Sequence, residues 1–334
     1  MKAIAQDRYG APEVLEFREV EQPVAGPHDL LVRVHAASAN ARDWHIMRGD
    51  PYIVRLMSPS LFGLNGPRRQ IRGSDFAGRV ESVGAAVTRF RPGDEVYGDA
   101  GASDGAFAEY VVVSEDLAER KPSNISFEQA AAVPLAGTTA LMAVRDAARL
   151  HAGQRMLING SSGGVGTFAV QIARALGAHV TAVCSSRNVD LLQSLGADQV
   201  IDYTHEDFAR GSTRYDVLLD LVGNRSLSDC RRVLEPDGTL VLSGGGTSHG
   251  GSFFGPMGLM IRATVMSKFL QKPHMLVLTA TSNHANLATL RELIEDGKVT
   301  PVIDRTYPLD KTPEAIRYME VEHARAKVAI SVIN

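Results

Sequence analysis

Hydrophobic and polar positions alternate in several short, strand-like runs of the first third of the chain. Among these runs are MKAIAQDR, VLEFREVE and LLVRVHAAS, and the alternation returns in FAGRVESVG, DEVYG and FAEYVVV. Glycine and proline turn signals separate the runs. We therefore expect residues 1–121 to form an antiparallel, barrel-like domain, interrupted by a polar and irregular segment over residues 40–71.

The pattern changes class after this β-rich part. Ser126 and Gln129 have the spacing of a capping box, and the run TTALMAVRDAARL after Pro134 is typical of a helix. From Arg155 onward, apolar strands alternate with amphipathic helices, which predicts a parallel sheet covered by helices. We expect HMLVLTAT to add a sixth strand, and a closing helix and strand in residues 307–334 to return to the first domain.

The most informative stretch is RMLINGSSGGVGTFAVQIARALGA, residues 155–178, in which an apolar strand, a glycine-rich turn and a helix follow one another. Such a turn lets the backbone approach a pyrophosphate, and the helix N-terminus presents free N–H groups to it. Ser161 stands where the first glycine of the usual fingerprint falls, so this fingerprint is a variant. The alternative is a glycine-rich turn in another kind of α/β protein. The residues expected to contact a dinucleotide here are Gly163, Gly164, Val165 and Gly166.

Composition narrows the range of partners and compartments. A chain of 334 residues favours two domains, and its net charge of −3 without a basic block favours small-molecule ligands over nucleic acid or an anionic membrane. The sequence shows no apolar signal region or membrane-spanning run, so we expect a cytoplasmic protein. Cys184 and Cys230 are the only cysteines, which excludes a disulfide framework. The Met- and Leu-rich residues 255–270 are interpreted as a segment near the cleft or at a subunit contact, with a membrane-surface helix as the alternative.

Three stretches together resemble the medium-chain dehydrogenase/reductases. They are RGSDFAGRVESVGAAVTRFRPGDEVYG, NGSSGGVG and GADQVIDY. The resemblance covers nearly the whole chain. It implies an α/β protein with a GroES-like β-rich catalytic domain in residues 1–125 and 300–334, and a Rossmann NADP-binding domain in residues 126–299. It also implies a cofactor in the cleft between the two domains, and a homodimer.

The zinc ligands of that family are changed in this sequence. The zinc-dependent alcohol dehydrogenases have a cysteine ligand, an aspartate three residues on and a histidine two further, and here Asn40, Asp43 and His45 have that spacing. The family's Gly-His-Glu motif is replaced by Gly73-Ser74-Asp75. A catalytic zinc takes three protein ligands, so two losses predict that no metal binds. The sequence is similar to the zinc-independent quinone oxidoreductase branch.

The candidate catalytic residues follow from that resemblance. Without a Lewis acid, hydride transfer to a quinone or enone is easier than alcohol oxidation, because hydrogen-bond donors can steady the charge on a conjugated oxygen. Asn40, His45 and Tyr52 are the candidate donors, and each has a structural alternative: an Asx-turn, an ordinary loop histidine and a loop-covering tyrosine. We expect Asp43 and Asp75 to orient their neighbours.

The cofactor preference is predicted from the end of the second strand of the cofactor domain. Ser185, Ser186 and Arg187 follow that strand without an acidic residue, and Tyr203 ends the next strand, which favours the 2′-phosphate of NADP(H). The alternative is that the serines cap a helix and the arginine is solvated. Other positions expected to border the cofactor, with simple capping or tight turns as the alternative, are Thr138, Gly223, Gly244 and Gly245.

These observations favour an NADPH-dependent reductase of quinones or α,β-unsaturated carbonyls. Two alternatives stay open at this point: a zinc-independent alcohol or aldehyde dehydrogenase, and a non-catalytic NADPH-binding protein.

Overall fold

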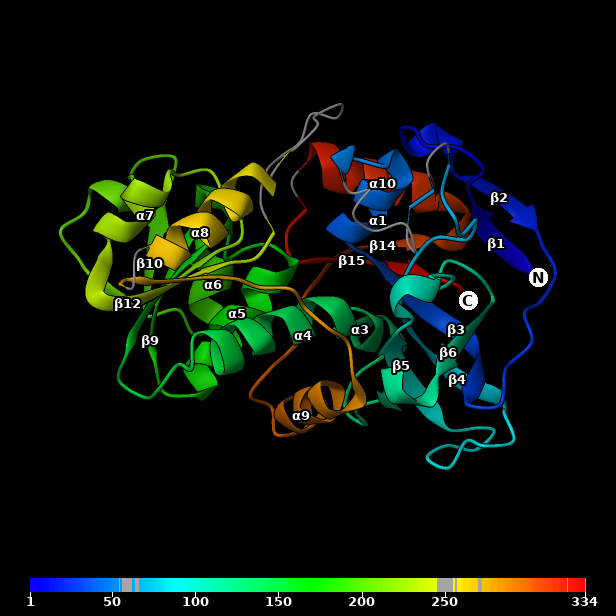
Figure 1. Cartoon of the computed structure of the whole chain (residues 1–334). Helices are drawn as coiled ribbons and strands as arrows, with labels where there is room; N and C mark the ends of the chain where they lie inside the picture. Colours follow the sequence, from blue (N-terminus) through cyan, green and yellow to red (C-terminus); the bar gives the residue numbers. More distant parts are fainter. Residues whose placement is uncertain are drawn as a thin grey trace.

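The computed structural model describes residues 1–53, 55, 62–63, 66–244, 255, 257–269, 272–322 and 324–333. It contains one mostly antiparallel sheet and one parallel sheet, which lie side by side with α3 (Phe127–Ala131) and α4 (Pro134–Leu141) across their junction (Figure 1). The predicted α/β class, with a β-rich part and a doubly wound part, is confirmed. None of the described helices combines the length and hydrophobicity needed to cross a bilayer.

The antiparallel sheet is centred on one long strand, β3, which pairs with β4, β6 and β15. The predicted alternation holds in the middle of β3, where Arg33 and His35 are less buried than their neighbours, whereas consecutive residues are buried toward both ends of the strand. The strands of this sheet are β3 (Asp29–Ala39), β4 (Asp75–Val83), β5 (Glu95–Asp99), β6 (Tyr110–Ser114), β7 (Ala118–Arg120), β14 (Ile303–Pro308) and β15 (Lys327–Ser331). Beside it, β1 (Lys2–Ala5) and β2 (Glu16–Glu19) form an antiparallel pair.

The register of β3 brings distant parts of the sequence together at its carboxyl end. Ser38 lies opposite Asp75 of β4, and Ala39 lies opposite Val328 of β15. The residue that follows β3, Asn40, therefore lies beside the first residues of both neighbouring strands.

The expectation of an irregular segment over residues 40–71 is wrong at its beginning. The chain forms α1 (Ala41–Arg48) directly after Asn40, and Gly49 ends the helix in the left-handed conformation with φ 61°. Asparagine before a helix and glycine after it are the usual boundary residues, so this pair was the available signal. The helix buries Ile46 and Met47, and α10 (Thr312–Val321) packs beside it.

The parallel sheet has the order β10-β9-β8-β11-β12-β13, and all its neighbours pair in parallel. The predicted sixth strand is confirmed as β13. The chain changes direction across the sheet after β10, so the carboxyl ends of β8 and β11 border the crevice where such folds bind ligands. Its strands are β8 (Arg155–Asn159), β9 (His179–Cys184), β10 (Gln199–Asp202), β11 (Tyr215–Asp220), β12 (Leu234–Leu242) and β13 (His274–Val277). The remaining described helices are α5 (Gly164–Ala175), α6 (Val189–Ser194), α7 (Leu227–Arg232), α8 (Met257–Phe269) and α9 (His284–Glu295).

The core under the crevice follows from the periodicity of α5. Phe168 and Ile172 lie one helical turn apart and are buried in the same cluster as Met156 and Ile158 of β8. Burying a side chain of this size contributes about 1.5 to 3 kcal/mol relative to leaving it exposed. This contact fixes the N-terminus of α5 relative to the end of β8.

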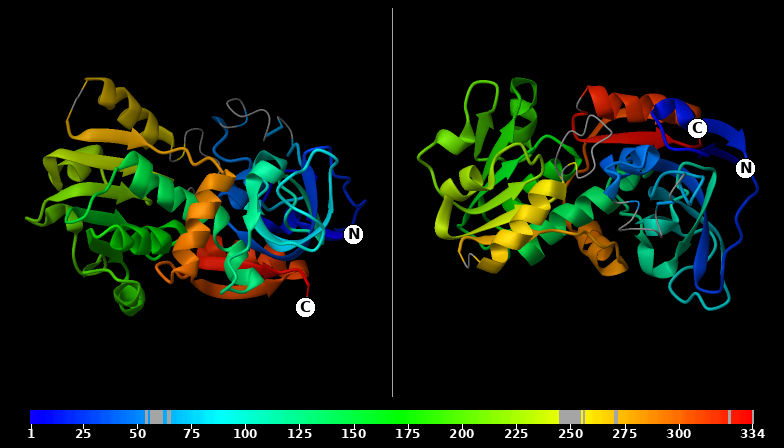
Figure 2. Two further views of the ribbon diagram at one scale, coloured as in Figure 1. Left: turned by 90° about the horizontal axis from the view of Figure 1, so that it is seen from below. Right: turned by 45° about the horizontal axis from the view of Figure 1, so that its top comes forward.

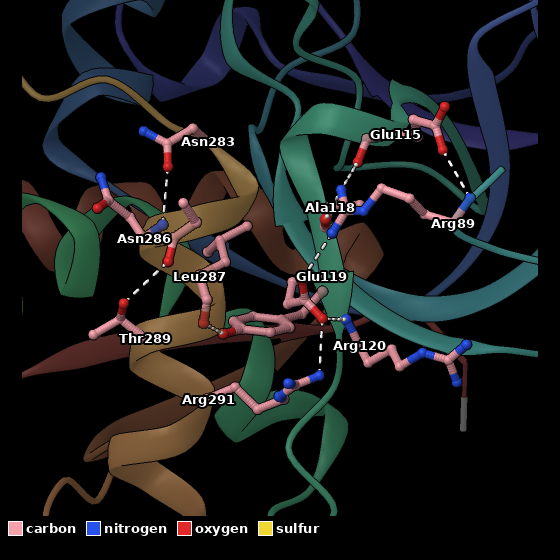
Figure 3. Close-up of polar contacts among 12 residues, drawn as sticks. Arg89, Glu115, Ala118, Glu119, Arg120, Asn283, Asn286, Leu287, Thr289 and Arg291 are labelled. Carbon is pink, nitrogen blue, oxygen red and sulfur yellow. Dashed lines mark hydrogen bonds and ion pairs between the residues drawn. The ribbon is translucent and has the colours of Figure 1, made fainter. Parts of the chain in front are cut away.

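Helix α9 joins the two sheets at their junction (Figures 1 and 2). Its buried contact is a hydrogen bond of 2.6 Å from the phenol of Tyr97 on β5 to the carbonyl oxygen of Leu287. Beside it, Glu119 of β7 accepts from Arg89 and from Arg291 of α9, at 2.8 and 2.9 Å (Figure 3). These contacts hold the parallel sheet against the antiparallel sheet on the side of the molecule that α9 covers.

Candidate functional site

The glycine turn after β8 has the geometry of a dinucleotide cradle. A Cβ on Gly166 would lie 2.3 Å from the carbonyl oxygen of Gly160, so only glycine allows α5 to begin this close to the turn. Gly160 itself has φ +88°, in the left-handed region. At Gly163 an added Cβ would meet only the Gly160 oxygen, at 3.5 Å, which leaves the approach to the helix N-terminus open. The first amides of a helix have no partners within it, so this end of α5 fits an anionic pyrophosphate.

Ser161 explains the variant fingerprint. Its hydroxyl is fully buried, donates to the carbonyl oxygen of Ile158 at 2.6 Å and accepts from the amide of Val183 at 3.0 Å. A glycine at this position would remove both contacts. The serine therefore fastens the turn to β8 and β9 without entering the open face of the cradle.

A buried polar cluster lies on the other side of this turn. Asp75 accepts hydrogen bonds from the Ser38 hydroxyl at 3.2 Å, from the Asn40 amide at 3.0 Å and from the backbone amide of Leu135 at 3.1 Å. The ammonium of Lys327 lies 3.6 Å from the same carboxylate and donates to the Oδ1 atom of Asn40. Asp75 thus orients its neighbours, in the way the resemblance implies.

Burial sets the ionisation of this cluster. It raises the pKa of Asp75 to about 6 and lowers the pKa of Lys327, while the attraction between the two groups opposes both shifts. The neighbouring Asp43 accepts from the backbone amide of Asn40 at 2.7 Å, and burial raises its pKa to about 7. Low polarity around carboxylates disfavours their charged form.

Lys327 was not among the residues predicted from the sequence, although a signal for it was present. The strand KVAIS carries one lysine among apolar residues that are buried in the structure. A lysine is almost never fully buried unless it is paired, so a charge at the start of a core strand indicates a partner. The partner could not be named, because Asp75 is distant in the sequence.

The three predicted catalytic residues do not share one environment. Asn40 belongs to the buried cluster, and its two amide hydrogens are directed to Asp75 and to the carbonyl oxygen of Ser38. His45 lies on α1, is stacked on Trp44 with ring centroids 3.9 Å apart, and bonds through Nδ1 to the carbonyl oxygen of Asp50 at 2.9 Å. Their catalytic roles stay predictions, but Asn40 is already occupied as a donor.

The side chains of His45 and Tyr52 are more available than that of Asn40 for hydrogen bonds to a ligand. A carbonyl oxygen only accepts, so it fixes the Nδ1–H tautomer of His45 and leaves Nε2 as an acceptor. Burial lowers the pKa of this imidazole, which favours its neutral form. Tyr52 is 44% exposed, and the Arg55 guanidinium lies 4.8 Å from its ring centroid.

Two buried hydroxyls lack hydrogen-bond partners among the described residues. They belong to Ser74, next to Asp75, and to Thr138 in the second turn of α4. Thr139 instead donates to the carbonyl oxygen of Leu135 at 2.7 Å. Thr138 therefore keeps a free hydroxyl in the part of the helix that lies near Asp75, as a ligand-binding residue would.

The predicted 2′-phosphate site contains an acidic residue, Asp202, that was not predicted from the sequence. Parallel pairing puts Asp202 of β10 opposite Cys184 of β9, and the Ser186 hydroxyl donates to the Asp202 carboxylate. Hydrogen bonds from Ser186 and Thr204 lower the pKa of Asp202 to about 2. Arg187 donates to the carbonyl oxygen of Glu322 at 3.0 Å.

The remaining predicted cofactor residues lie at strand ends or outside the described chain. Ser185 precedes the short helical turn after β9, Tyr203 is 56% exposed, and Gly223 and Gly244 have φ values of 67° and 79°. The amide of Gly223 donates to Asp220 at 3.0 Å, which shapes the loop after β11. The last of these residues, Gly245, lies outside the described residues.

The donors at the family's zinc positions do not fit a zinc ion. Asn40 and Ser74 offer an amide and a hydroxyl in place of thiolate and imidazole, and the Lys327 ammonium already lies against Asn40 and Asp75. A cation so near would repel a divalent metal. Among the described residues no group of three His, Cys, Asp or Glu side chains is arranged to hold a metal.

Comparisons with known proteins agree with this architecture. Residues 26–123 match the alcohol dehydrogenase GroES-like domain, and residues 195–330 match a domain described as zinc-binding dehydrogenase. The chain is 34% identical to the NAD(P)H oxidoreductase RTN4IP1, mitochondrial, of Bos taurus, over 100% of this chain and 89% of that protein. It is also 34% identical to the 2-methylene-furan-3-one reductase of Solanum lycopersicum, over 100% of this chain and 79% of that protein. The solved structure of the quinone oxidoreductase from Coxiella burnetii superposes with a TM-score of 0.85 at 31% identity, covering 100% and 99% of the two chains.

The raised pKa of Asp43 predicts a pH-dependent contribution to stability. The unfolded carboxyl titrates near pH 4, so protonated Asp43 stabilises the fold fully below that pH, and the contribution is lost as pH rises through about 7. The free energy of unfolding of the wild type minus that of Asp43→Asn should therefore fall between pH 5 and pH 8. Urea unfolding at several pH values measures it, with Asp116→Asn on the exposed surface as the control. A difference that is constant or rises over this range would contradict the assignment.

Proposed function

Because the chain belongs to the quinone oxidoreductase-like branch of the medium-chain dehydrogenase/reductase superfamily, we propose that it is an NADPH-dependent oxidoreductase that reduces quinones or α,β-unsaturated carbonyls without a metal. The observation that carries the proposal is the open glycine cradle of α5 beside a cluster in which an ammonium lies against Asn40, the residue that replaces the family's cysteine ligand. The relatives named above as oxidoreductases and as a reductase support it.

The cradle and the crevice assign the binding roles. Gly164, Val165 and Gly166 would hold the pyrophosphate through backbone amides, while Gly163, whose amide donates to Gly160, would leave its approach open. Thr138 would offer its unpartnered hydroxyl to the nicotinamide end. NADPH bound there would supply a hydride. The protein would supply the orientation of the cofactor and the acceptor.

An activated acceptor suits this site better than a saturated one. A saturated ketone places its full developing charge on one oxygen, which a metal would normally stabilise. A quinone or enone spreads the charge over a conjugated system, so a few hydrogen bonds suffice. The tomato relative is named for a substrate with a conjugated C=C bond, which supports this choice.

His45 and Tyr52 are the proposed contacts of the reacting molecules. The Nε2 atom of His45 suits a hydroxyl donor, such as a ribose or a reduced acceptor, because Nδ1 is held by Asp50. The exposed phenol of Tyr52 can donate to an acceptor oxygen. Asn40 is proposed to act by orientation, since its amide hydrogens have partners within the protein.

NADPH oxidation over a panel of acceptors tests the proposed function. In the presence of a chelator, quinones and enones should be reduced at least about tenfold faster than saturated ketones, because no Lewis acid assists the latter.

Tyr52→Phe should lower kcat/KM for the accepted substrate and leave the Kd of NADPH unchanged. Metal analysis of protein purified without added zinc should find far less than one equivalent.

Two outcomes of the same panel would favour other functions. Oxidation of a saturated alcohol without quinone or enone turnover would indicate an alcohol dehydrogenase. NADPH binding without turnover of any acceptor would indicate a non-catalytic NADPH-binding protein. Zinc that is stoichiometric and required for turnover would overturn the metal-free mechanism.

Cofactor selectivity is proposed to be a balance between Arg187 and Asp202. A guanidinium attracts a 2′-phosphate and a carboxylate repels it. Arg187→Ala should weaken NADPH binding by about tenfold and leave NADH binding nearly unchanged. Asp202→Asn should tighten NADPH binding, again with little effect on NADH. The Kd values follow from cofactor fluorescence, with Arg210→Ala, an exposed arginine of the same domain, as the control. Equal changes for the two cofactors would remove the argument.

A homodimer is proposed through the free edge of the parallel sheet. Strand β13 ends that sheet, its Leu276 is 39% exposed, and α8 exposes Ile261 and Val265 at 43% and 50%, one helical turn apart. Such an apolar strip beside an edge strand is typical of a subunit contact. The proposed cytoplasmic location is independent of this contact.

Light scattering after gel filtration tests the dimer. The wild type should have twice the chain mass, and Val265→Lys should shift it toward the monomer because a charge would be buried. Val24→Lys is the control, since Val24 is 89% exposed and far along the chain from this edge. A monomeric wild type would exclude this contact.

A further inference from the structure

Lys327 connects the cofactor cradle to the buried cluster of the catalytic domain. The residue before it, Ala326, donates its backbone amide to the carbonyl oxygen of Ser162 in the glycine turn at 2.7 Å. The lysine stem then passes beneath the first residue of α5, where a Cβ on Gly164 would lie 3.0 Å from Cδ of Lys327. Its ammonium ends among Asn40, Asp75 and the carbonyl oxygen of Ala39.

This ammonium is deeply buried and has a defined set of partners. The side chains of Lys327 and Asp75 are 3% and 0% exposed. Transfer of two charges from water to such a place costs several kcal/mol for each ion, and the attraction between them often fails to repay it. A hydrophobic pair of the same volume would stabilise the fold as well, so stability alone does not explain why this ion pair is present.

The charge of Asp75 is shared among several donors. It accepts from Ser38, from Asn40 and from the amide of Leu135, which lies in the first turn of α4 where the helix dipole is positive. Lys327 is therefore one of four groups that offset one carboxylate. The carboxylates of Asp43 and Asp99 also attract the ammonium, and hydrogen bonds from the amide of Asn40 and from Gly101 and Ser282 offset their charges in turn. Part of the positive potential of the ammonium therefore remains uncancelled beside Asn40.

The ammonium also determines how Asn40 is oriented. An ammonium only donates, so the amide atom facing Lys327 must be Oδ1, and the NH2 group must face Asp75 and Ser38. Asn40 begins α1, which carries His45. The position of that helix relative to the glycine turn therefore depends on Lys327.

We propose that Lys327 is the resident cation of this site: a positioning residue that substitutes for the metal by holding Asn40 and by stabilising negative charge on the acceptor oxygen through its electrostatic potential. The inference rests on the proposed function. In a purely structural role, Lys327 would only have to neutralise Asp75. In the proposed role, the positive charge itself is needed for rapid hydride transfer.

A double-mutant cycle that removes the two charges distinguishes a structural from an electrostatic role of Lys327. Lys327→Met removes the ammonium and keeps most of the volume, Asp75→Asn removes the carboxylate and keeps an amide, and the double variant removes both charges. Breaking the pair should lower Tm in each single variant, and the double variant should recover much of that loss. The matched control is the exposed pair Asp296 and Lys298, changed in the same way.

The expected signature is recovery of stability without recovery of rate. Lys327→Met and the double variant should both lower kcat by about ten- to a hundredfold, with KM changed little. Lys327→Arg should restore part of the rate. The Kd of NADPH, from fluorescence, should stay within about threefold of the wild type, since the ammonium faces Asn40. A double variant with wild-type kcat, or a loss found mainly in NADPH affinity, would overturn the proposal.

A second measurement does not require turnover. The phenolate of 4-nitrophenol resembles the anionic oxygen that forms when a quinone accepts a hydride, and its absorbance reports its ionisation. In the complex with NADP+, the wild type should lower the pKa of bound 4-nitrophenol relative to the double variant by about one unit, a tenfold change in ionisation. Equal values for both proteins would exclude an electrostatic role. If the wild type turned over no acceptor, the proposed function would fail, while this titration would still decide the role of Lys327.

Discussion

The contact between Lys327 and Asp75 is the constraint on which the site depends. Asp75 begins β4, Lys327 begins β15, and both strands pair with β3, so three segments of the catalytic sheet converge on one buried carboxylate. The backbone beside Lys327 is bonded to the glycine turn, and the amide of Leu135 ties in α4. The polar groups of this buried cluster are thus connected to one another, so that none of them can move independently of the others.

Much of the fold could be predicted because it depends on local patterns. The glycine turn with its flanking strand and helix, and the alternation of strands and helices after Arg155, are properties of neighbouring residues. Helix α1 was missed although Asn40 and Gly49 mark its ends, because its sequence lies within a polar segment. The residues that mark the two ends of the helix were present, but the hydrophobic periodicity between them was too weak to indicate a helix.

The unpredicted parts of the site depend on contacts between distant residues. Lys327 meets Asn40 through the pairing of β15 with β3, and Asp202 meets Ser186 through the pairing of β10 with β9. Neither pairing can be derived from the spacing of the residues involved. The expectation that no acid lies near the 2′-phosphate position held for the second strand alone, and the neighbouring strand supplied one. Arg187 likewise has a partner, Glu322, from the end of α10.

Isotope transfer would show whether the protein delivers a hydride from NADPH to an activated double bond without a metal. NADPH carrying deuterium at C4 of the nicotinamide would be incubated with an enone and the chelated protein, and the product examined by NMR. Hydride transfer from NADPH predicts deuterium from one face of the nicotinamide at the β-carbon of the product, and a solvent proton at the α-carbon. Product without that label, or label transfer that requires added zinc, would contradict it.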